Sequence, residues 1–196
     1  MKNIFYIYGA TLAASLVLAS CNDSERRPGY VRGHPNQVAA DRGKLEAEDR
    51  KKRDSGFTFE TVANQYGEIK LAELAVRRSR TPEIRKLAER IIADHSASLN
   101  KLKTLAQARS FAVPVEENDG SKKMLEKISH SSANEFDEQW CAQLIGMHDE
   151  SIGKFQERLN DTADRELKAY IGDILPLLKD HLKSLKGYRE NLARQK

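Results

Sequence analysis

Apolar residues recur every three or four positions through most of this chain, from about residue 57 to residue 194. This spacing places them along one face of an α-helix, whereas the alternation expected of β-strands is nearly absent. Turn and capping signals divide the pattern into four long stretches with mostly short connections. We therefore predict an all-α domain over residues 57–194, folded as an up-down-up-down four-helix bundle.

The first two predicted helices are separated by a clear boundary. They span about 57–79 and 82–109. Thr81 is a candidate N-cap, and Pro82 suits the first helical position because its fixed backbone angle matches the helix and its missing N–H leaves no donor unpaired there.

Local signals also mark the second half of the domain. Ser132 followed by Glu135 predicts a capping box at the start of the third helix. The fourth helix follows residues 161–162 and contains Pro176, where we expect a kink because the apolar stripe continues in phase on both sides. A short extra helix near residues 124–128 is predicted in the longer connection between the second and third helices.

The amino terminus has the pattern of a lipoprotein signal peptide. Lys2 precedes an apolar run that ends at Leu18, and Ala19, Ser20 and Cys21 follow directly. The run is shorter than the roughly 20 residues of a membrane-spanning helix, and small residues before the cysteine fit a signal-peptidase site. We predict that residues 1–20 are removed and that acylated Cys21 anchors the protein to a membrane. An ordinary signal peptide with a chance cysteine, or an uncleaved anchor, is the alternative.

Residues 21–56 are predicted to form a lipid-anchored flexible linker. They are rich in charged residues, Gly and Pro and have few apolar residues, so they cannot bury enough surface to offset the entropy of ordering. Residues 37–53 favour an extended or transient helix by composition but lack an apolar stripe. Asn22, rather than Asp, after the cysteine is similar to lipoproteins that leave the inner membrane. We therefore expect an outer-membrane location facing the periplasm.

Three histidines lie within the apolar stripes and near the middle of their predicted helices: His95, His148 and His181. Because the midpoints of neighbouring helices lie level in a bundle, the three imidazoles can meet in one core layer, and the midpoint of the first helix adds Glu68. Imidazole nitrogen and carboxylate oxygen are ligands for transition metals, and bundle cores build metal sites in this way. These four residues are the predicted ligands of a divalent ion such as zinc, iron or copper.

Acidic neighbours of the histidines are candidates to orient the rings. Asp94, Asp149 and Asp180 are predicted to accept hydrogen bonds from the ring nitrogens that do not face the metal, and the alternative for each is a solvated helix face. A second alternative concerns the whole layer: Glu68 and the histidines, hydrogen-bonded to one another and to Tyr66 or Tyr170, would then only fix the register of the bundle.

Two function classes follow from these patterns. One is an envelope binding module that holds a metal ion or small ligand at the core layer, and the other is a structural or interaction protein of the envelope. An enzyme is a third and weaker alternative, because the chain has no recognisable nucleophile motif, phosphate loop or paired-carboxylate signature. Nucleic-acid binding is not expected either, because 33 Lys and Arg residues mix with 29 acidic residues and the chain carries a secretion signal. Cys141 is predicted to be a small buried residue.

Several short motifs occur along the domain: ANQYGEI at 63–69, LAELA at 71–75, ADH at 93–95, VP at 113–114, FD at 136–137, His148, LP at 175–176 and His181. Together they resemble the domain-of-unknown-function family 4142, described as predicted outer-membrane or periplasmic proteins with a ferritin-like bundle. The resemblance covers residues 57–190 and implies a ferritin-like fold and a functional role for Glu68, His95, His148 and His181.

Three features depart from that family or from ferritin chemistry. Trp140 stands where the family often has tyrosine, and Met147 precedes His148 where an Asp-His pair is usual. Di-iron carboxylate centres also need Glu-x-x-His pairs, but the residue three positions before each core histidine is Ile or Leu. We therefore do not predict a ferritin-type di-iron centre.

Overall fold

The computed structural model describes residues 35–194, and this part of the chain contains five α-helices and no β-strand. The predicted all-α helical bundle is confirmed, as is a short extra helix between the second and third long helices. The signal peptide and the lipidation site at Cys21 lie outside the described residues. No helix within residues 35–194 combines the length and the apolar character needed to cross a membrane. The helices are α1 (Pro35–Arg78), α2 (Pro82–Ala108), α3 (Asp119–Ser129), α4 (Phe136–Asp161) and α5 (Arg165–Arg194).

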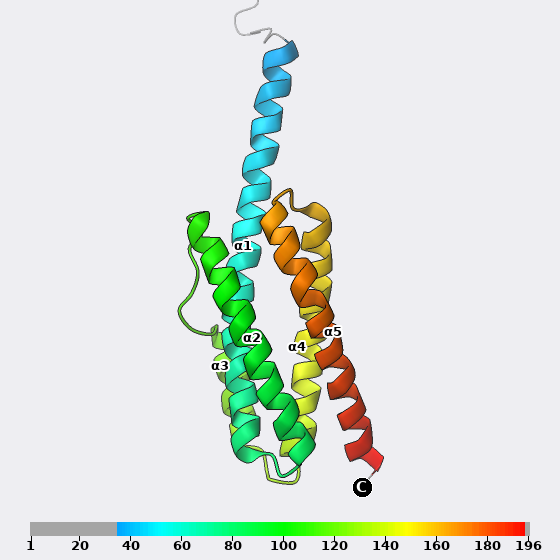
Figure 1. The fold of residues 1–196 in the computed structure, drawn as a ribbon. Helices are drawn as coiled ribbons and strands as arrows, with labels where there is room; N and C mark the ends of the chain where they lie inside the picture. The colour runs from blue at the N-terminus through cyan, green and yellow to red at the C-terminus, as the bar shows by residue number, and fades with distance from the viewer. Residues whose placement is uncertain (1–34, 195–196) are drawn as a thin grey trace, which may run out of the picture.

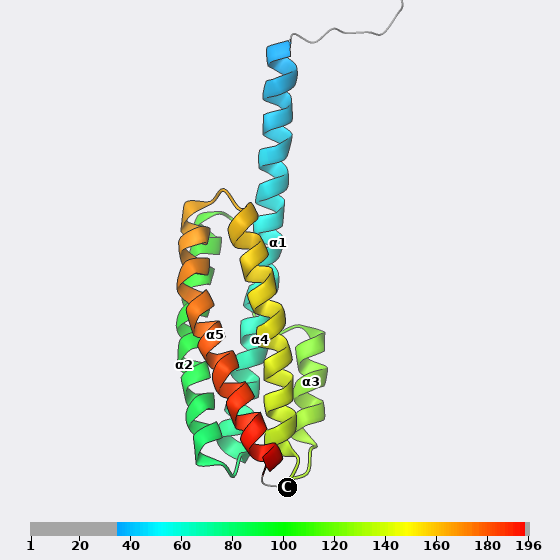
Figure 2. The ribbon, with the colours of Figure 1, turned by 90° about the vertical axis from the view of Figure 1, so that its right-hand side faces the viewer.

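The directions of the helices differ from the predicted up-down-up-down order. Figure 1 shows α2 and α4 running the same way, with α1 and α5 running opposite to them. Contacts at both ends agree: Thr81 before α2 donates to Asp137 at the start of α4, at 2.7 Å. Arg109 after α2 bonds to Asp164 just before α5. The reason is the connection through α3, which returns along the bundle instead of making a short turn (Figure 2).

The first helix begins at Pro35 instead of at the predicted residue 57. Its outer part projects beyond the bundle (Figure 1) and leaves Val38 and Leu45 57% and 63% exposed. Residues 35–56 therefore belong to a continuous helix, where we expected a flexible linker with an extended or transient helix at residues 37–53. Ala, Leu, Glu, Lys and Arg have high helix propensity, and growth from an already packed helix avoids the cost of nucleation.

Contact between α1 and the rest of the bundle begins at Arg53 and Asp54. Arg53 bonds to Asp161 at 2.9 Å, and Asp54 accepts a 2.8 Å hydrogen bond from Thr162. Asp54 is buried and also lies 3.5 Å from the guanidinium of the buried Arg158. These polar contacts fix the point at which α1 leaves the bundle.

The apolar core consists of two clusters, one toward each end of the bundle. One surrounds Trp140 and Leu144. The indole N–H of Trp140 donates a 2.9 Å hydrogen bond to the Leu71 carbonyl oxygen. The other surrounds Phe155 and Tyr170. The candidate polar layer from α1, α2, α4 and α5 separates these two clusters.

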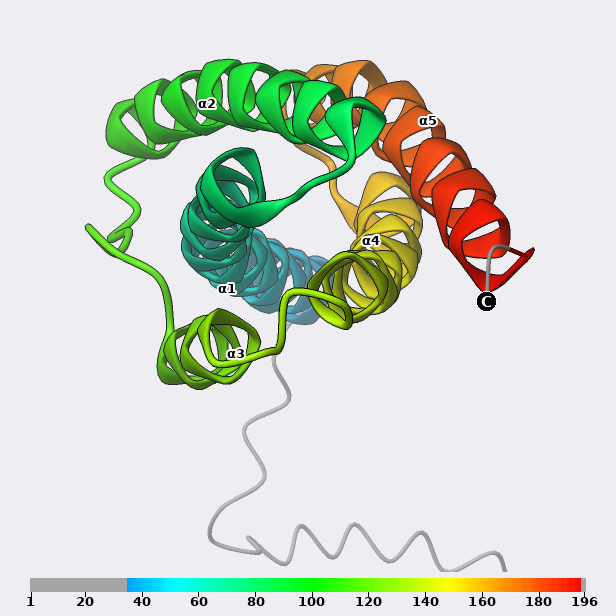
Figure 3. The same ribbon diagram turned by 90° about the horizontal axis from the view of Figure 1, so that it is seen from below.

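Helix α3 packs on the outside of the bundle, beside α1 and α4 (Figure 3). Asn118 is its N-cap, and the Asn118 side chain accepts a 2.8 Å hydrogen bond from the Ser121 N–H. A Cβ on Gly67 of α1 would lie only 2.5 Å from the Ser121 hydroxyl oxygen. Glycine at this position therefore permits the close approach of α3 to the turn of α1 that carries Glu68.

Several local predictions can be compared with the helix ends. Pro82 begins α2, although the Thr81 hydroxyl bonds to Asp137 instead of capping that helix. Helix α4 begins at Phe136, and Ser132 bonds to Glu135 in the turn before it. Helix α5 continues through Pro176, as the uninterrupted apolar stripe predicts.

Candidate metal centre

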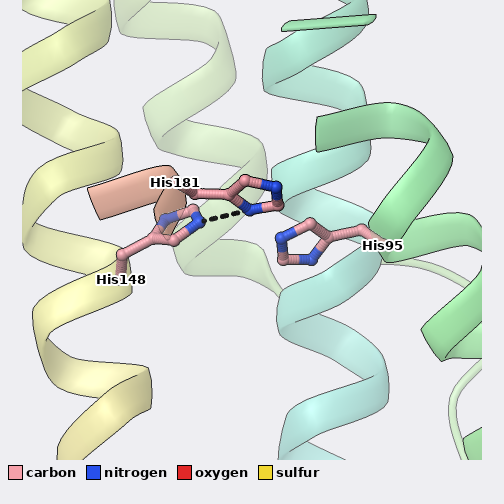
Figure 4. A group of neighbouring side chains, drawn as sticks. All are labelled: His95, His148 and His181. Carbon is pink, nitrogen blue, oxygen red and sulfur yellow. Dashed lines mark hydrogen bonds between the residues drawn. The ribbon is translucent and has the colours of Figure 1, made fainter. Parts of the chain in front are cut away.

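Three helices each contribute one buried histidine to the same level of the core. His95 on α2, His148 on α4 and His181 on α5 are between 0% and 1% exposed. Their ring centroids lie 5.5–5.6 Å apart (Figure 4). The level is shared because each histidine lies about half-way along its helix, which holds whether neighbouring helices run parallel or antiparallel.

The distances among the rings suit a bound transition metal. One nitrogen from each ring can be chosen so that all three nitrogens lie within 4.8 Å of one another. Among residues 35–194, these three histidines are the group whose side chains lie close enough together to share a metal ion. His148 Nε2 and His181 Nδ1 are 3.4 Å apart. Ligand nitrogens at 2.0–2.1 Å from a tetrahedral ion are separated by about 3.4 Å.

Hydrogen bonds hold two of the rings with a lone pair directed inward. His148 Nδ1 lies 3.0 Å from the Leu144 carbonyl oxygen, which can only accept, so Nδ1 carries the proton. His181 Nε2 lies 2.8 Å from the Asp94 carboxylate and is protonated for the same reason. His148 Nε2 and His181 Nδ1 are then both acceptors in the neutral rings, and they face each other.

Glu68 lies beside the third ring. Its Oε2 atom is 2.9 Å from His95 Nδ1, and its Oε1 atom is 4.0 Å from His148 Nδ1. Apart from this contact with Glu68 Oε2, the His95 ring makes no hydrogen bond, and Glu68 Oε1 is also buried without a hydrogen-bond partner. With Nδ1 beside Glu68, Nε2 is the His95 nitrogen left for a ligand, and Figure 4 shows one His95 nitrogen facing the other two rings.

This placement bears on the predicted ligand set. Glu68 belongs to the layer, as the helix midpoints predict, but its carboxylate faces Nδ1 atoms instead of the inward lone pairs. A carboxylate in this position orients a metal-binding histidine and raises its basicity. The geometry therefore gives Glu68 an orienting position beside His95.

Burial favours the neutral, metal-binding form of His148 and His181. It lowers the pKa of His148, and it lowers the pKa of His181 to about 4 although the Asp94 hydrogen bond acts in the opposite direction. Burial alone would raise the pKa of Glu68, but His95 and His148 outweigh it and lower that pKa to about 2. Glu68 is therefore a carboxylate inside the core.

The three predicted orienting acids have different positions. Asp94 bonds to His181 on the neighbouring helix α5, and not to the adjacent His95. Asp149 and Asp180 are exposed, and their carboxylates pair with Lys186 and Arg90. Both carboxylates therefore contact these cations instead of the rings of the layer.

Sequence reasoning missed Arg90 and the Leu144 carbonyl. Arg90 lies one turn before Asp94, with its Nε atom 3.5 Å from the carboxylate, and it also pairs with Asp180. The spacing of four residues between Arg90 and Asp94 was a usable signal, because residues four apart lie on the same side of a helix. The Leu144 carbonyl belongs to the backbone, so no residue type in the sequence could have indicated its hydrogen bond with His148.

Tyrosines proposed to bond to the layer have other partners. Tyr170 accepts a 2.7 Å hydrogen bond from Gln65, and its hydroxyl lies 2.8 Å from that of Ser98. Tyr66 accepts a hydrogen bond from Lys103 at 3.1 Å. Cys141 is buried as predicted, and burial raises the pKa of its thiol to about 12, so it is an unreactive core residue.

Fold and site together define an all-helical bundle protein with a three-histidine centre in its core. The chain belongs to the family described as Domain of unknown function (DUF4142), which matches residues 39–187. This confirms the resemblance read from its short motifs. No curated protein matches the chain.

Solved structures of CopM have a similar fold. CopM in the Cu(II)-bound form is 24% identical, with a TM-score of 0.62 over 70% of this chain and 96% of that chain. CopM in the Cu(I)-bound form is 22% identical, with the same TM-score and coverage. CopM in the Ag-bound form is 23% identical with a TM-score of 0.61, again over 70% and 96% of the two chains. At these identities the likeness concerns the fold.

Proposed function

We propose that this protein binds a copper ion through His95, His148 and His181 and serves as a copper-holding lipoprotein of the bacterial envelope. The observation that carries the proposal is the pair of inward lone pairs on His148 Nε2 and His181 Nδ1, 3.4 Å apart, with the opposite nitrogens held by Leu144 and Asp94. Metal-binding histidines typically donate their second N–H to such an acceptor.

A layer that only specifies packing fits the geometry less well. Buried polar groups in a structural network are normally hydrogen-bonded, and an unpaired one costs about 1–3 kcal/mol. His95 Nε2 and Glu68 Oε1 lack a hydrogen bond. An ion held by the three rings supplies the missing partner of His95 and separates the two facing lone pairs.

Copper is favoured over the other candidate ions for two reasons. Copper(II) binds nitrogen sites more tightly than zinc or iron(II) in the general affinity order, and imidazole suits copper in both oxidation states. CopM, with the similar fold, is known in Cu(II)-bound and Cu(I)-bound forms. Zinc remains the natural competitor to include in a test.

Membrane attachment completes the proposal. Acylated Cys21 would anchor the protein to the outer membrane facing the periplasm, as the sequence pattern at residues 18–22 suggests. The helical residues 35–53 would then act as a stiff spacer of about 30 Å, at a rise of 1.5 Å per residue. The metal-holding bundle would stand clear of the lipid surface.

Copper titration of the purified, tag-free protein tests the proposed function. We expect one ion per chain in competition with a chromophoric chelator, for Cu(I) or Cu(II), and weaker retention of zinc. The His148→Gln variant should lose most of the affinity. His130→Gln is the matched control, because His130 follows α3 on the surface and only contacts Ser129 and Glu126. Equal binding by both variants, or none by the wild type, would contradict the proposal.

A further inference from the structure

A cleft between α1, α3 and α4 leads from the surface toward the histidine layer. It has a volume of about 430 Å³, and its lining includes Glu60 and Glu68 from α1 and Glu150 and Lys154 from α4. A smaller chamber of about 20 Å³ shares Glu60, Glu68 and Lys154 with the cleft and is also lined by His95. The two spaces are therefore adjacent, and the chamber reaches the ring of His95.

A buried carboxylate lies in the wall that these two spaces share. Glu68 is only 2% exposed, and its Oε1 atom has no hydrogen-bond partner. Glu68 lines both the cleft and the chamber and lies against His95. A cation that reached the chamber would meet this carboxylate immediately before the histidines.

Lys154 spans the outer part of the cleft. Its ammonium group lies 2.9 Å from Glu150 on its own helix and 3.5 Å from Glu60 on α1. The Lys154 side chain is 44% exposed, so its ammonium group can leave the two carboxylates and move into solvent. In this position Lys154 neutralises the two carboxylates that an incoming cation would otherwise contact first.

The opposite side of the bundle offers a poorer approach. A groove of about 190 Å³ between α2 and α5 is lined by Asp94, Lys101 and Asp173. There Asp94 accepts a hydrogen bond from the Nε2–H group of His181 and lies 3.5 Å from the Arg90 guanidinium. A cation entering by this groove would reach His181 on its N–H side instead of at a lone pair.

We propose that the α1/α3/α4 cleft is the path by which the metal ion enters and leaves, with Lys154 as its gate. This inference rests on the proposed metal binding. The incoming cation displaces the ammonium of Lys154 from Glu60 and Glu150, passes to Glu68, and is transferred to the three imidazoles. Exposed carboxylates suit a transit position, because they exchange cations readily and guide them by electrostatic attraction.

Stopped-flow kinetics with Cu(II) test this path, using quenching of the single tryptophan, Trp140, as the signal. Lys154→Gln should raise both the association and dissociation rates by about tenfold, the lower end of electrostatic effects on ion capture, and leave the equilibrium affinity within about twofold. Glu60→Gln should lower the association rate and weaken its salt dependence. Thermal melting monitored by circular dichroism confirms that each variant is folded.

Lys101→Gln is the matched control. It also removes one exposed, carboxylate-paired lysine, but from the α2/α5 groove, where Lys101 pairs with Asp173. Unchanged rates in Lys154→Gln, or equal acceleration in Lys101→Gln, would overturn the entry path while leaving metal binding intact. A wild-type protein that binds no metal at all would overturn the proposed function and the path together.

Discussion

His148 Nε2 and His181 Nδ1 face each other across 3.4 Å in the centre of the bundle, each with its other ring nitrogen already hydrogen-bonded. In two neutral rings this arrangement places two lone pairs together. Protonation of one ring would relieve the contact, but burial lowers the pKa of both. A bound cation removes the repulsion between the two lone pairs without protonating either ring. This pair is therefore central to the proposed function.

The role of Asp94 leads to the first prediction. Asp94→Asn keeps the shape of the side chain but weakens the acceptor that orients His181, so metal affinity should fall by about 10- to 100-fold, the range for partners of this kind. Isothermal or chelator-competition titration measures the change. Asp149→Asn is the control, because Asp149 is exposed and pairs with Lys186, and it should bind metal as the wild type does. Equal losses in both variants would exclude an orienting role for Asp94.

Stability of the metal-free protein should depend on pH. The folded-state pKa of His181 is about 4 and that of His148 is also lowered, below the ordinary value of 6.5. The unfolded chain therefore binds more protons between pH 6.5 and 4, so stability is present above this interval and is lost as the pH falls through it. Urea denaturation at several pH values should show this loss.

Two variants separate the contributions to that pH dependence. His181→Gln should flatten the dependence between pH 6.5 and 4, whereas the surface variant His130→Gln should not. Glu68, with its pKa lowered to about 2, adds a separate loss only below its ordinary value of 4.5. A wild-type stability that stays constant from pH 7 to pH 4 would show that the histidines are not buried as neutral rings.

Much of the core layer was predictable, because it depends on helical spacing alone. His95, His148 and His181 lie in phase with their apolar neighbours, so the helix period directs them inward. Their common level needs only that each lies near the middle of its helix. The same argument placed Glu68, although the sequence does not specify whether its carboxylate faces lone pairs or N–H groups, which depends on side-chain rotamers.

Other features depend on contacts that no periodic pattern encodes. Asp149 and Asp180 each adjoin a core histidine, but successive residues of a helix point about 100° apart, so both face solvent. Asp94 has the same spacing and still reaches the layer, because α5 packs beside it. The parallel course of α2 and α4 follows from the path of the chain through α3, and local capping signals do not report it.

The start of the bundle can be located by truncation. A fragment of residues 51–196 keeps Arg53 and Asp54 and should melt close to the temperature of a fragment of residues 35–196. A third fragment, residues 57–196, lacks the Asp54 hydrogen bond with Thr162 and the ion pair with buried Arg158. Its free energy of unfolding should be lower by about 1–3 kcal/mol. Differential scanning calorimetry measures the three fragments. A much lower melting temperature for the 51–196 fragment than for the 35–196 fragment would mean that the outer part of α1 packs on the bundle.

Membrane anchoring is tested at Cys21. Cys21→Ser should abolish labelling by radioactive palmitate and leave unprocessed or released protein, because the acylated residue is missing. Fractionation of cells that express the wild type should place it with the outer membrane. Cys141→Ser is the control, since Cys141 is buried in the core and should have no effect on labelling. Labelling that persists in Cys21→Ser would contradict the lipoprotein assignment.

X-ray absorption spectroscopy of the copper-loaded protein tests the central proposal most directly. The proposed site predicts about three nitrogen scatterers close to 2 Å from the ion, with the multiple scattering typical of imidazole rings. His95→Gln, His148→Gln or His181→Gln should each remove one imidazole from that shell or abolish loading. A shell of oxygen atoms without imidazole scattering, or a spectrum unchanged in all three variants, would contradict the proposal that this core layer holds copper.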